Sequence, residues 1–348
     1  MANENHSSAR GHDARSPLEI PGRAWKDIAA RTYKRVWDDN VGLVAAGVAF
    51  YAFFGLLSLL GLIVLTYSWV AEPQTVVGHF QTLTRILPND IALLIGQQLM
   101  TTVQSSEGAK GLGILVALLV ALYGGTNGSA AVITSLNIAY EEKEARSLLR
   151  FYFLALLMTV VAVVLAMLAI AAAASVAYLQ TQLPQATPIA VTAGKIVGYA
   201  LLVLVATVIA ATLYRFGPSR EEAKWKWITP GSLFAALTWL LLTVLFGFYV
   251  SKLTDYSATY GALGAVVALL TWLYLSAYVF IIGAELNSEM EHQTARDSTT
   301  GAPAPMGSRG AWAADNVAED DRVQDRPEEA REGEKLTQAS PTIADDED

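Results

Sequence analysis

The feature that most constrains this chain is a long uncharged stretch in its last third. No Asp, Glu, Lys or Arg occurs from Tyr260 to Ala284, and a strongly polar stretch, residues 285–291, follows at once. About 20 helical residues are enough to cross the roughly 30 Å hydrocarbon core of a bilayer. We therefore expect a membrane-spanning helix here, with a polar end that leaves the membrane.

Five further apolar stretches have a comparable length. Together they predict an all-α integral membrane protein with six transmembrane helices, over residues 41–70, 112–139, 151–178, 189–214, 230–249 and 260–284. Only 16% of the residues are charged, well below the roughly 25% of soluble domains. The chain contains no Cys, which excludes disulfides, thiolate metal sites and Cys nucleophiles.

The remaining segments divide the chain into three parts. We expect residues 1–22 to form a disordered N-terminal arm, residues 23–291 the membrane domain, and residues 292–348 a disordered acidic tail. Within the membrane domain, residues 23–39 and 74–104 repeat apolar residues at helical spacing. The first segment predicts an amphipathic helix on the membrane surface, and the second predicts outer amphipathic helices that lid the bundle or lie on the membrane.

The basic residues of the short loops predict the orientation. Twelve Lys and Arg residues lie in residues 23–40, between spans two and three, or between spans four and five, against three on the opposite side. Basic residues concentrate on the cytoplasmic side of membrane proteins. We therefore expect a multi-pass protein of the cytoplasmic membrane with both termini in the cytoplasm.

The second span contains the most unusual intramembrane stretch, Tyr123–Ser129, with three Gly and one Asn in seven residues. Glycines weaken a helix, and polar groups at membrane depth are expected to face protein or water. We predict a set of polar and aromatic residues that face one another inside the bundle: Tyr51, Asn127, Asn137, Trp272, Tyr274 and Glu285. The alternative for the glycine-rich parts is close helix packing.

The sequence offers no catalytic, cofactor-binding or metal-binding constellation. Metal-dependent RNA cleavage needs clustered His, Asp and Glu ligands, but the four histidines are scattered: His6, His12, His79 and His292. No phosphate-binding glycine motif is present. We therefore expect that the protein is not an enzyme and, in particular, not a ribonuclease. We also expect no nucleic-acid partner. Membrane lipids are the expected partners, with an envelope protein or a second copy of the chain as further candidates.

Four segments resemble one family of bacterial membrane proteins. They are AAGVAFYAFFGLLSLL from residue 45, GLGILVALLVALYGGTNGSAAVITSLNIAYEEKEARSLL from residue 111, LYRFGPSREEAKWKWITPGSLFAALTWLLL from residue 213, and DYSATYGALGAVVALLTWLYLSAYVFIIGAELNSEME from residue 255. In order and spacing they resemble the YihY/BrkB family, older members of which were labelled ribonuclease BN. The chain departs from the family at Leu59–Gly61, where a proline is common. The resemblance implies a six-helix protein of the cytoplasmic membrane and no agreed activity.

Two functions fit these observations. The polar, glycine-broken stretches favour a transporter-like or lipid-handling protein that moves a lipid or an amphipathic solute through or along the bundle. No central Asp or Glu lies in the spans to carry a coupling ion, and Glu285 is the nearest. The alternative is a non-transporting membrane adaptor or envelope-assembly protein that docks other components.

Overall fold

The computed structural model describes residues 11–70, 107–182, 188–252 and 262–318. These residues are helical or irregular, and an isolated antiparallel bridge between Ala223 and Thr299 is the one β contact among them. The predicted outer helices at 74–104 lie outside the described residues. So do residues 1–10 of the predicted N-terminal arm and residues 319–348 of the predicted tail.

Six long helices occupy the positions of the six predicted spans. They are α3 (Val41–Val70), α6 (Glu107–Ala139), α7 (Leu148–Gln182), α8 (Pro188–Phe216), α9 (Trp225–Lys252) and α11 (Ala262–His292). Five of them, α3, α7, α8, α9 and α11, are long and apolar enough to cross a membrane by length and composition. Among the described residues, α6 does not qualify on the same criteria.

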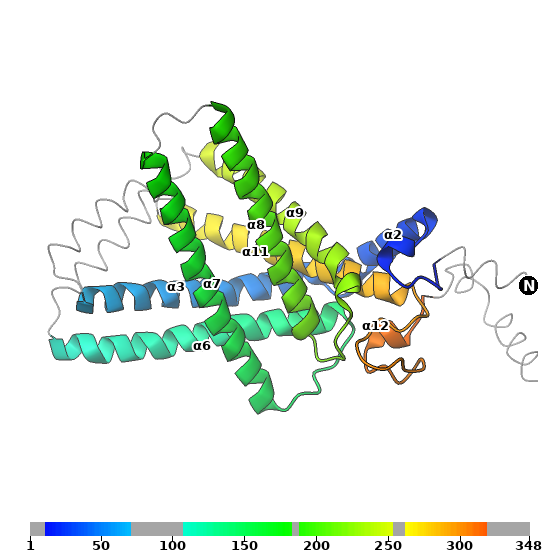
Figure 1. Cartoon of the computed structure of the whole chain (residues 1–348). Coiled ribbons are helices and arrows are strands. Elements are labelled where there is room, and N and C mark those ends of the chain that lie inside the picture. Colours follow the sequence, from blue (N-terminus) through cyan, green and yellow to red (C-terminus); the bar gives the residue numbers. More distant parts are fainter. Residues whose placement is uncertain (1–10, 71–106, 183–187, 253–261, 319–348) are drawn as a thin grey trace, which may run out of the picture.

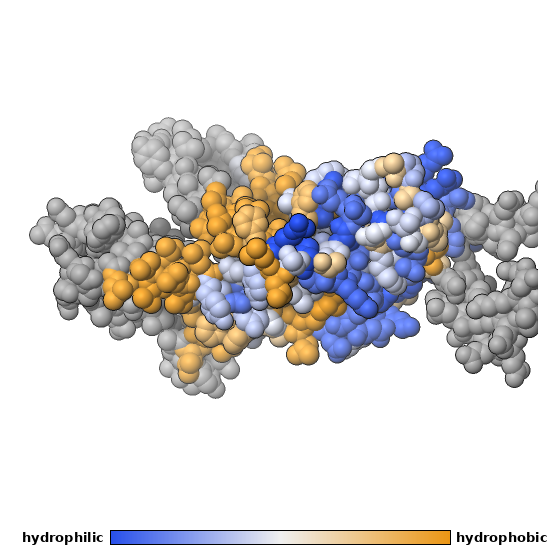
Figure 2. Space-filling view, turned by 90° about the horizontal axis from the view of Figure 1, so that it is seen from below, coloured by the Kyte–Doolittle hydropathy of each residue, from blue (hydrophilic) through white to orange (hydrophobic). Residues whose placement is uncertain are grey.

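The helices pack mainly as a chain of neighbours (Figure 1). Helices α3 and α6 run side by side, α7 packs on α6, and α8 packs on α9. Helix α11 touches α9, α3 and α6, and therefore connects the two groups. Figure 2 shows hydrophobic residues over the long helices and hydrophilic residues over the end that carries the chain termini of the described part.

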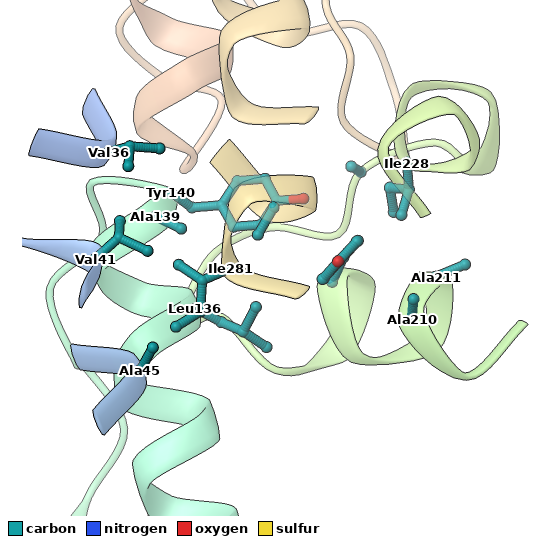
Figure 3. Close-up of a cluster of buried hydrophobic side chains, with 13 residues drawn as sticks. Val36, Val41, Ala45, Leu136, Ala139, Tyr140, Ala210, Ala211, Ile228 and Ile281 are labelled. Atoms are coloured by element: carbon teal, nitrogen blue, oxygen red, sulfur yellow. The ribbon is translucent and has the colours of Figure 1, made fainter. Parts of the chain in front are cut away.

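The best-packed region lies at that hydrophilic end. Figure 3 shows Tyr140, just after α6, beside residues from α3, α6 and α11 and with α8 and α9 residues farther along the same core. The buried members of this core are Val36, Val41, Ala45, Leu136, Ala139, Tyr140, Ala210, Ala211, Tyr214, Ala223, Ile228, Ile281 and Ala284. Many small residues allow the helices to approach closely here, whereas large apolar side chains stay exposed farther along them.

Helix α2 (Gly22–Asp38) packs on protein. Its buried stripe, Ala24, Ile28, Thr32 and Val36, faces a neighbouring part of the chain, and α2 contacts α11 and α3. Trp227 and Met290 join Ala24 and Ile28 in a second small core. The apolar periodicity therefore predicted the helix correctly, but α11 and α9 cover the stripe that we expected to rest on the membrane surface.

Two segments predicted to be disordered fold over this end of the bundle. They comprise residues 11–20, with the short helix η1 (Pro17–Glu19), and residues 293–318, with the short helix α12 (Trp312–Asp315). We call them together the cap. Backbone hydrogen bonds join its halves, since Ala295 N donates to His12 O at 2.8 Å. The expectation of disorder is wrong for these residues. They have no periodic apolar face, but buried Ala side chains and hydrogen-bonded polar side chains hold them in a defined structure.

Candidate functional site

The glycine-rich part of α6 presents three different faces. Gly124 and Gly128 face α3: a Cβ on Gly124 would lie 3.2 Å from Gly55 Cα, and one on Gly128 would lie 3.6 Å from Tyr51 O. Gly125 faces α7, where an added Cβ would overlap Thr159. Gly124 therefore permits a close backbone contact with α3 and Gly125 leaves room for Thr159 of α7, as the packing alternative predicts, whereas Gly128 makes an ordinary contact.

The third face of α6 points away from both neighbours. Tyr123, Asn127, Ala130 and Thr134 follow one another at helical spacing, and Tyr123 is 74% exposed. We call these four residues the α6 stripe. The Asn127 side chain donates to Tyr123 O at 2.8 Å, and the Thr134 hydroxyl donates to Ala130 O at 2.9 Å. The donors of Asn127 and Thr134 are thus satisfied within α6.

The predicted site residues do not gather at one place. Tyr51 and Asn127 lie in the α3–α6 region, because the Tyr51 backbone borders Gly128. Trp272 packs against Trp239 of α9 with ring centroids 6.2 Å apart. The Tyr274 hydroxyl lies toward α3, 3.4 Å from the position of a Cβ on Gly42.

The other two predicted residues, Asn137 and Glu285, lie near the hydrophilic end. Asn137 donates to Glu144 Oε2 at 2.9 Å and accepts from Ser219 N at 2.7 Å, which ties the end of α6 to the loop between α8 and α9. Arg146 donates to both oxygens of Glu144 at 2.7 Å. These hydrogen bonds from Arg146 hold the pKa of Glu144 at about 2, below its ordinary 4.5, despite partial burial.

The polar end of α11 is the most deeply buried charged segment in the described chain. Glu285, Asn287, Glu289 and Glu291 are between 0% and 2% exposed. Buried charges are costly unless they are paired, so each of these side chains needs a partner. We define the ionic cluster as Asp39, Glu285, Glu289 and Glu291 with Arg31, Arg35 and Arg220.

Arginines from α2 and from the α8–α9 loop supply most of these partners. Arg31 Nε donates to Glu289 Oε2 at 2.6 Å, and Arg35 contacts both Glu289 and Glu141. Arg220 Nη2 donates to Glu291 Oε2 at 2.6 Å, and its guanidinium lies over the Tyr140 ring, 4.9 Å from the centroid. Three arginines thus face three buried glutamates and the half-buried Asp39.

Asn287 of α11 forms hydrogen bonds with backbone groups of α9 beside Pro230. We predicted that Pro230 opens the fifth span, but α9 begins at Trp225 and contains Pro230. Asn287 accepts from Gly231 N at 2.8 Å and donates to Ile228 O at 2.9 Å. It therefore satisfies backbone groups beside the proline, which interior prolines normally leave unpaired. No local pattern in the sequence indicates this role, although Pro230 and Asn287 both lie in segments that carry the family resemblance.

A glycine crossing brings α9 and α11 close enough for that contact. A Cβ on Gly231 would overlap Gly283 O and Asn287, and one on Gly283 would lie 2.6 Å from the Tyr214 hydroxyl. Tyr214 in turn donates to Phe280 O at 2.6 Å. These short contacts fix the rotation of α11 and thereby direct Glu285 inward.

The cap closes the ionic cluster from outside. Ser298 Oγ donates to Glu291 Oε2 at 2.8 Å, and Glu142 Oε1 accepts from Trp312 N at 2.7 Å. Trp312 also packs on His292, with ring centroids 4.9 Å apart, and lies beneath the Arg35 guanidinium. The part of the chain that the structure describes contains no group of three or more His, Cys, Asp or Glu able to hold a metal ion.

Several long apolar helices with a charged, folded end define a helical membrane protein. Residues 32–306 match the model of a family described as "Virulence factor BrkB", and the chain belongs to this family. The match extends into the cap, beyond the segments that carried the resemblance.

Curated relatives agree with the family. The chain is 27% identical over 242 residues to the ribonuclease-like protein YfkH of Bacillus subtilis (strain 168), covering 68% of this chain and 86% of that protein. It is 26% identical over 273 residues to a UPF0761 membrane protein of Albidiferax ferrireducens, covering 75% and 61%. It is 35% identical over 79 residues to the UPF0761 membrane protein IL2447 of Idiomarina loihiensis, covering 23% and 28%. No solved structure matches the chain.

Proposed function

We propose that this protein is a transporter-like, lipid-handling protein of the bacterial cytoplasmic membrane. In this proposal a phospholipid headgroup moves along the α6 stripe while its acyl chains stay in the bilayer. The carrying observation is that Tyr123 and Thr134 are exposed, with the half-buried Asn127 between them, in a helix pair whose other exposed side chains are mainly large and apolar. Polar residues in spanning segments are costly and mark pathways for polar groups.

The surface around the stripe supports a path along the bundle rather than through it. Figure 2 shows pale, weakly hydrophilic residues that interrupt the hydrophobic part of this face. On α3, Phe50, Tyr51 and Phe54 are exposed beside the same region. A polar headgroup sliding over such a surface would exchange water for hydroxyl, amide and aromatic contacts instead of hydrocarbon, which lowers the cost of crossing.

The proposal includes six spans and a defined orientation. Helix α6 packs along α3 over its glycine face, so we infer that it crosses the membrane together with α3. The ionic cluster and the cap lie at the end rich in Lys and Arg, and on the positive-inside rule we infer that this end faces the cytoplasm. Both termini then lie on the cytoplasmic side.

The test uses the full chain in liposomes with fluorescent phospholipid in both leaflets. An impermeant reductant added outside bleaches the outer leaflet only, unless lipid exchanges between leaflets. We expect bleaching beyond the outer-leaflet share for the wild type and a return to that share for Asn127→Leu, which removes the amide and keeps a similar size.

Thr212→Val is the matched control for this experiment. Thr212 on α8 is also exposed, and its hydroxyl donates to Val208 O at 2.8 Å, as Thr134 does to Ala130. The control should bleach like the wild type. Bleaching that stops at the outer-leaflet share in the wild type, or persists fully in Asn127→Leu, would contradict the lipid path.

A membrane adaptor is the second candidate, and the folded cap favours it. Residues 11–20 and 293–318 form a structured surface at the charged end, beyond what a membrane anchor requires. Adaptor function would leave lipid exchange absent in the wild type. It would also make a cap variant such as Trp312→Ala, rather than Asn127→Leu, the one that loses partner or self-association, measured by size-exclusion chromatography with light scattering.

We further propose that the chain is not a ribonuclease, although that activity appears in the name of the Bacillus subtilis relative. The proposal rests on the scattered histidines and on carboxylates that are engaged with arginines, as in the Arg31–Glu289 and Arg220–Glu291 pairs. Purified protein incubated with labelled RNA and Mg²⁺ or Mn²⁺ should leave the RNA intact. Cleavage that co-purifies with the wild type and disappears in a cluster variant would contradict it.

A further inference from the structure

One buried carboxyl group of the ionic cluster is not paired with any of the arginines of the cluster. Arg31 engages Glu289, Arg220 engages Glu291, and Arg35 engages Glu289 and Glu141. Glu285 is 1% exposed and forms no ion pair in the described chain. An isolated ionised carboxylate at such a position would cost far more than a neutral carboxylic acid.

The neighbour of Glu285 is a second carboxyl group, Asp39. The two carboxyl groups lie close enough across the junction of α2, α3 and α11 for each to influence the ionisation of the other. The backbone turn fixes Asp39 in place, since α2 ends at Asp38 and Asn40 adopts a left-handed φ of 51° before α3 begins. This turn therefore directs Asp39 toward α11.

Two buried oxygens of this pair have no hydrogen-bond donor in the described structure. They are Asp39 Oδ2 and Glu285 Oε1. Ionised carboxylates only accept hydrogen bonds, so two carboxyl groups become partners only when one of them carries a proton. Unsatisfied buried polar atoms call for such an explanation.

We propose that Asp39 and Glu285 form a proton-binding site, in which one proton shared between the two carboxyl groups joins the α2–α3 turn to the inner end of α11. The proton is bound as a carboxyl O–H of one residue that donates to the other. Its release leaves two carboxylates side by side, and their repulsion loosens the contact between the turn and α11. The site does not depend on the lipid path along α6.

The surrounding charges set the conditions for the site. Arg35 approaches from α2 and favours ionisation, whereas Asp38 and Glu289 add negative charge and oppose it. Tyr140, at the end of α6, lies in the same electrostatic environment beside Arg220 and Glu291. Burial raises the pKa of Asp39 above its ordinary value, more than Arg35 lowers it. These influences leave one proton on the pair and one negative charge facing Arg35.

Infrared spectroscopy of the full chain in lipid nanodiscs tests the proposal directly. The carbonyl stretch of a protonated carboxylic acid is separate from that of a carboxylate. We expect one such band in the wild type at neutral pH, which shifts on H/D exchange and disappears on alkaline titration. Glu285→Gln and Asp39→Asn should each abolish it, because the amide N–H replaces the shared proton as the donor.

Glu144→Gln is the matched control, since Glu144 is ionised and paired with Arg146. This variant should keep the band. A wild type without the band at neutral pH, or a band that survives both amide substitutions, would overturn the proposal. A carboxyl signal that responds to Na⁺ at constant pH, and not to pH, would also overturn it in favour of a sodium site. If Glu285→Gln does not fold, the partly exposed Asp39→Asn decides the outcome alone.

Discussion

Replacing Arg220 by Met should destabilise the protein strongly. Arg220 and Glu291 are 1% and 0% exposed at their side chains and lie 2.6 Å apart. The substitution keeps the volume of the aliphatic stem but leaves Glu291 buried with a hydrogen bond from Ser298 as its main compensation. Removing one partner of a buried ion pair typically costs about 3–5 kcal/mol. We therefore expect the free energy of unfolding to fall by about that amount.

The double variant Arg220→Met with Glu291→Met separates the pair from its environment. Replacing both charges by apolar residues of similar volume is often neutral or stabilising, because the desolvation penalty disappears with the charges. We expect the double variant to recover most of the loss. The assay is equilibrium unfolding in mixed micelles with increasing SDS, followed by tryptophan fluorescence.

A surface pair supplies the control for this measurement. Arg296 and Asp13 lie 3.5 Å apart but are 54% and 62% exposed, and exposed pairs contribute roughly 0–1 kcal/mol. Arg296→Met should therefore remain close to the wild type. The reasoning would be refuted if Arg220→Met unfolded like Arg296→Met, or if the double variant were as unstable as the single one.

Three further predictions follow from the contacts of the charged end. Gly231→Ala places a methyl group against Gly283 O and Asn287. Overpacking of this kind costs roughly 1–3 kcal/mol, which the same unfolding assay should show. Gly247→Ala is the control and should leave stability nearly unchanged, because no atom lies within 4 Å of the added Cβ. Because the pKa of Glu144 is about 2 in the folded protein and ordinarily 4.5, its stabilising contribution is present above pH 4.5 and is lost as the pH falls towards 2. Glu144→Gln should therefore show a weaker acid dependence of unfolding than the wild type, and an equal dependence would disprove this. Trp312→Ala removes contacts with His292 and Arg35, so limited proteolysis should cut within residues 293–318 faster than in the wild type; equal rates would show that the cap does not depend on Trp312.

The sequence predicted the long helices well because apolar length is a direct signal of membrane-spanning helices. The helix predicted over residues 41–70 coincides with α3, Val41–Val70. Prediction from the sequence failed where tertiary contacts override a local signal. Pro230 normally marks a helix start, but Asn287, far away in the chain, satisfies the groups around it. The cap escaped prediction because its order depends on single contacts, such as Thr294 Oγ1 donating to Ala14 O at 2.7 Å.

The sequence indicated residues such as Asn127 and Glu285 as members of a candidate site, but it did not indicate how their side chains are arranged. Asn127 is a polar residue at membrane depth, but its amide bonds its own helix and its side chain stays half-buried on the α6 stripe. Glu285 was selected for its place at the end of a span, yet its partners come from α2 and the α2–α3 turn. Helical rotation and long-range pairing decide both outcomes, and neither can be read from the order of residues along one span.

The central claim is that the α6 stripe offers a polar path along the membrane part of the bundle. The chain has no Cys, so single cysteines can be introduced in the full protein at Tyr123, Asn127 and Thr134. Val160 on α7 is an exposed control at similar depth, because its neighbour Thr159 contacts Ser129 at 2.9 Å. In proteoliposomes, an impermeant water-soluble thiol reagent should label the three stripe positions and spare Val160→Cys. Equal protection of all four positions would contradict a polar path along α6.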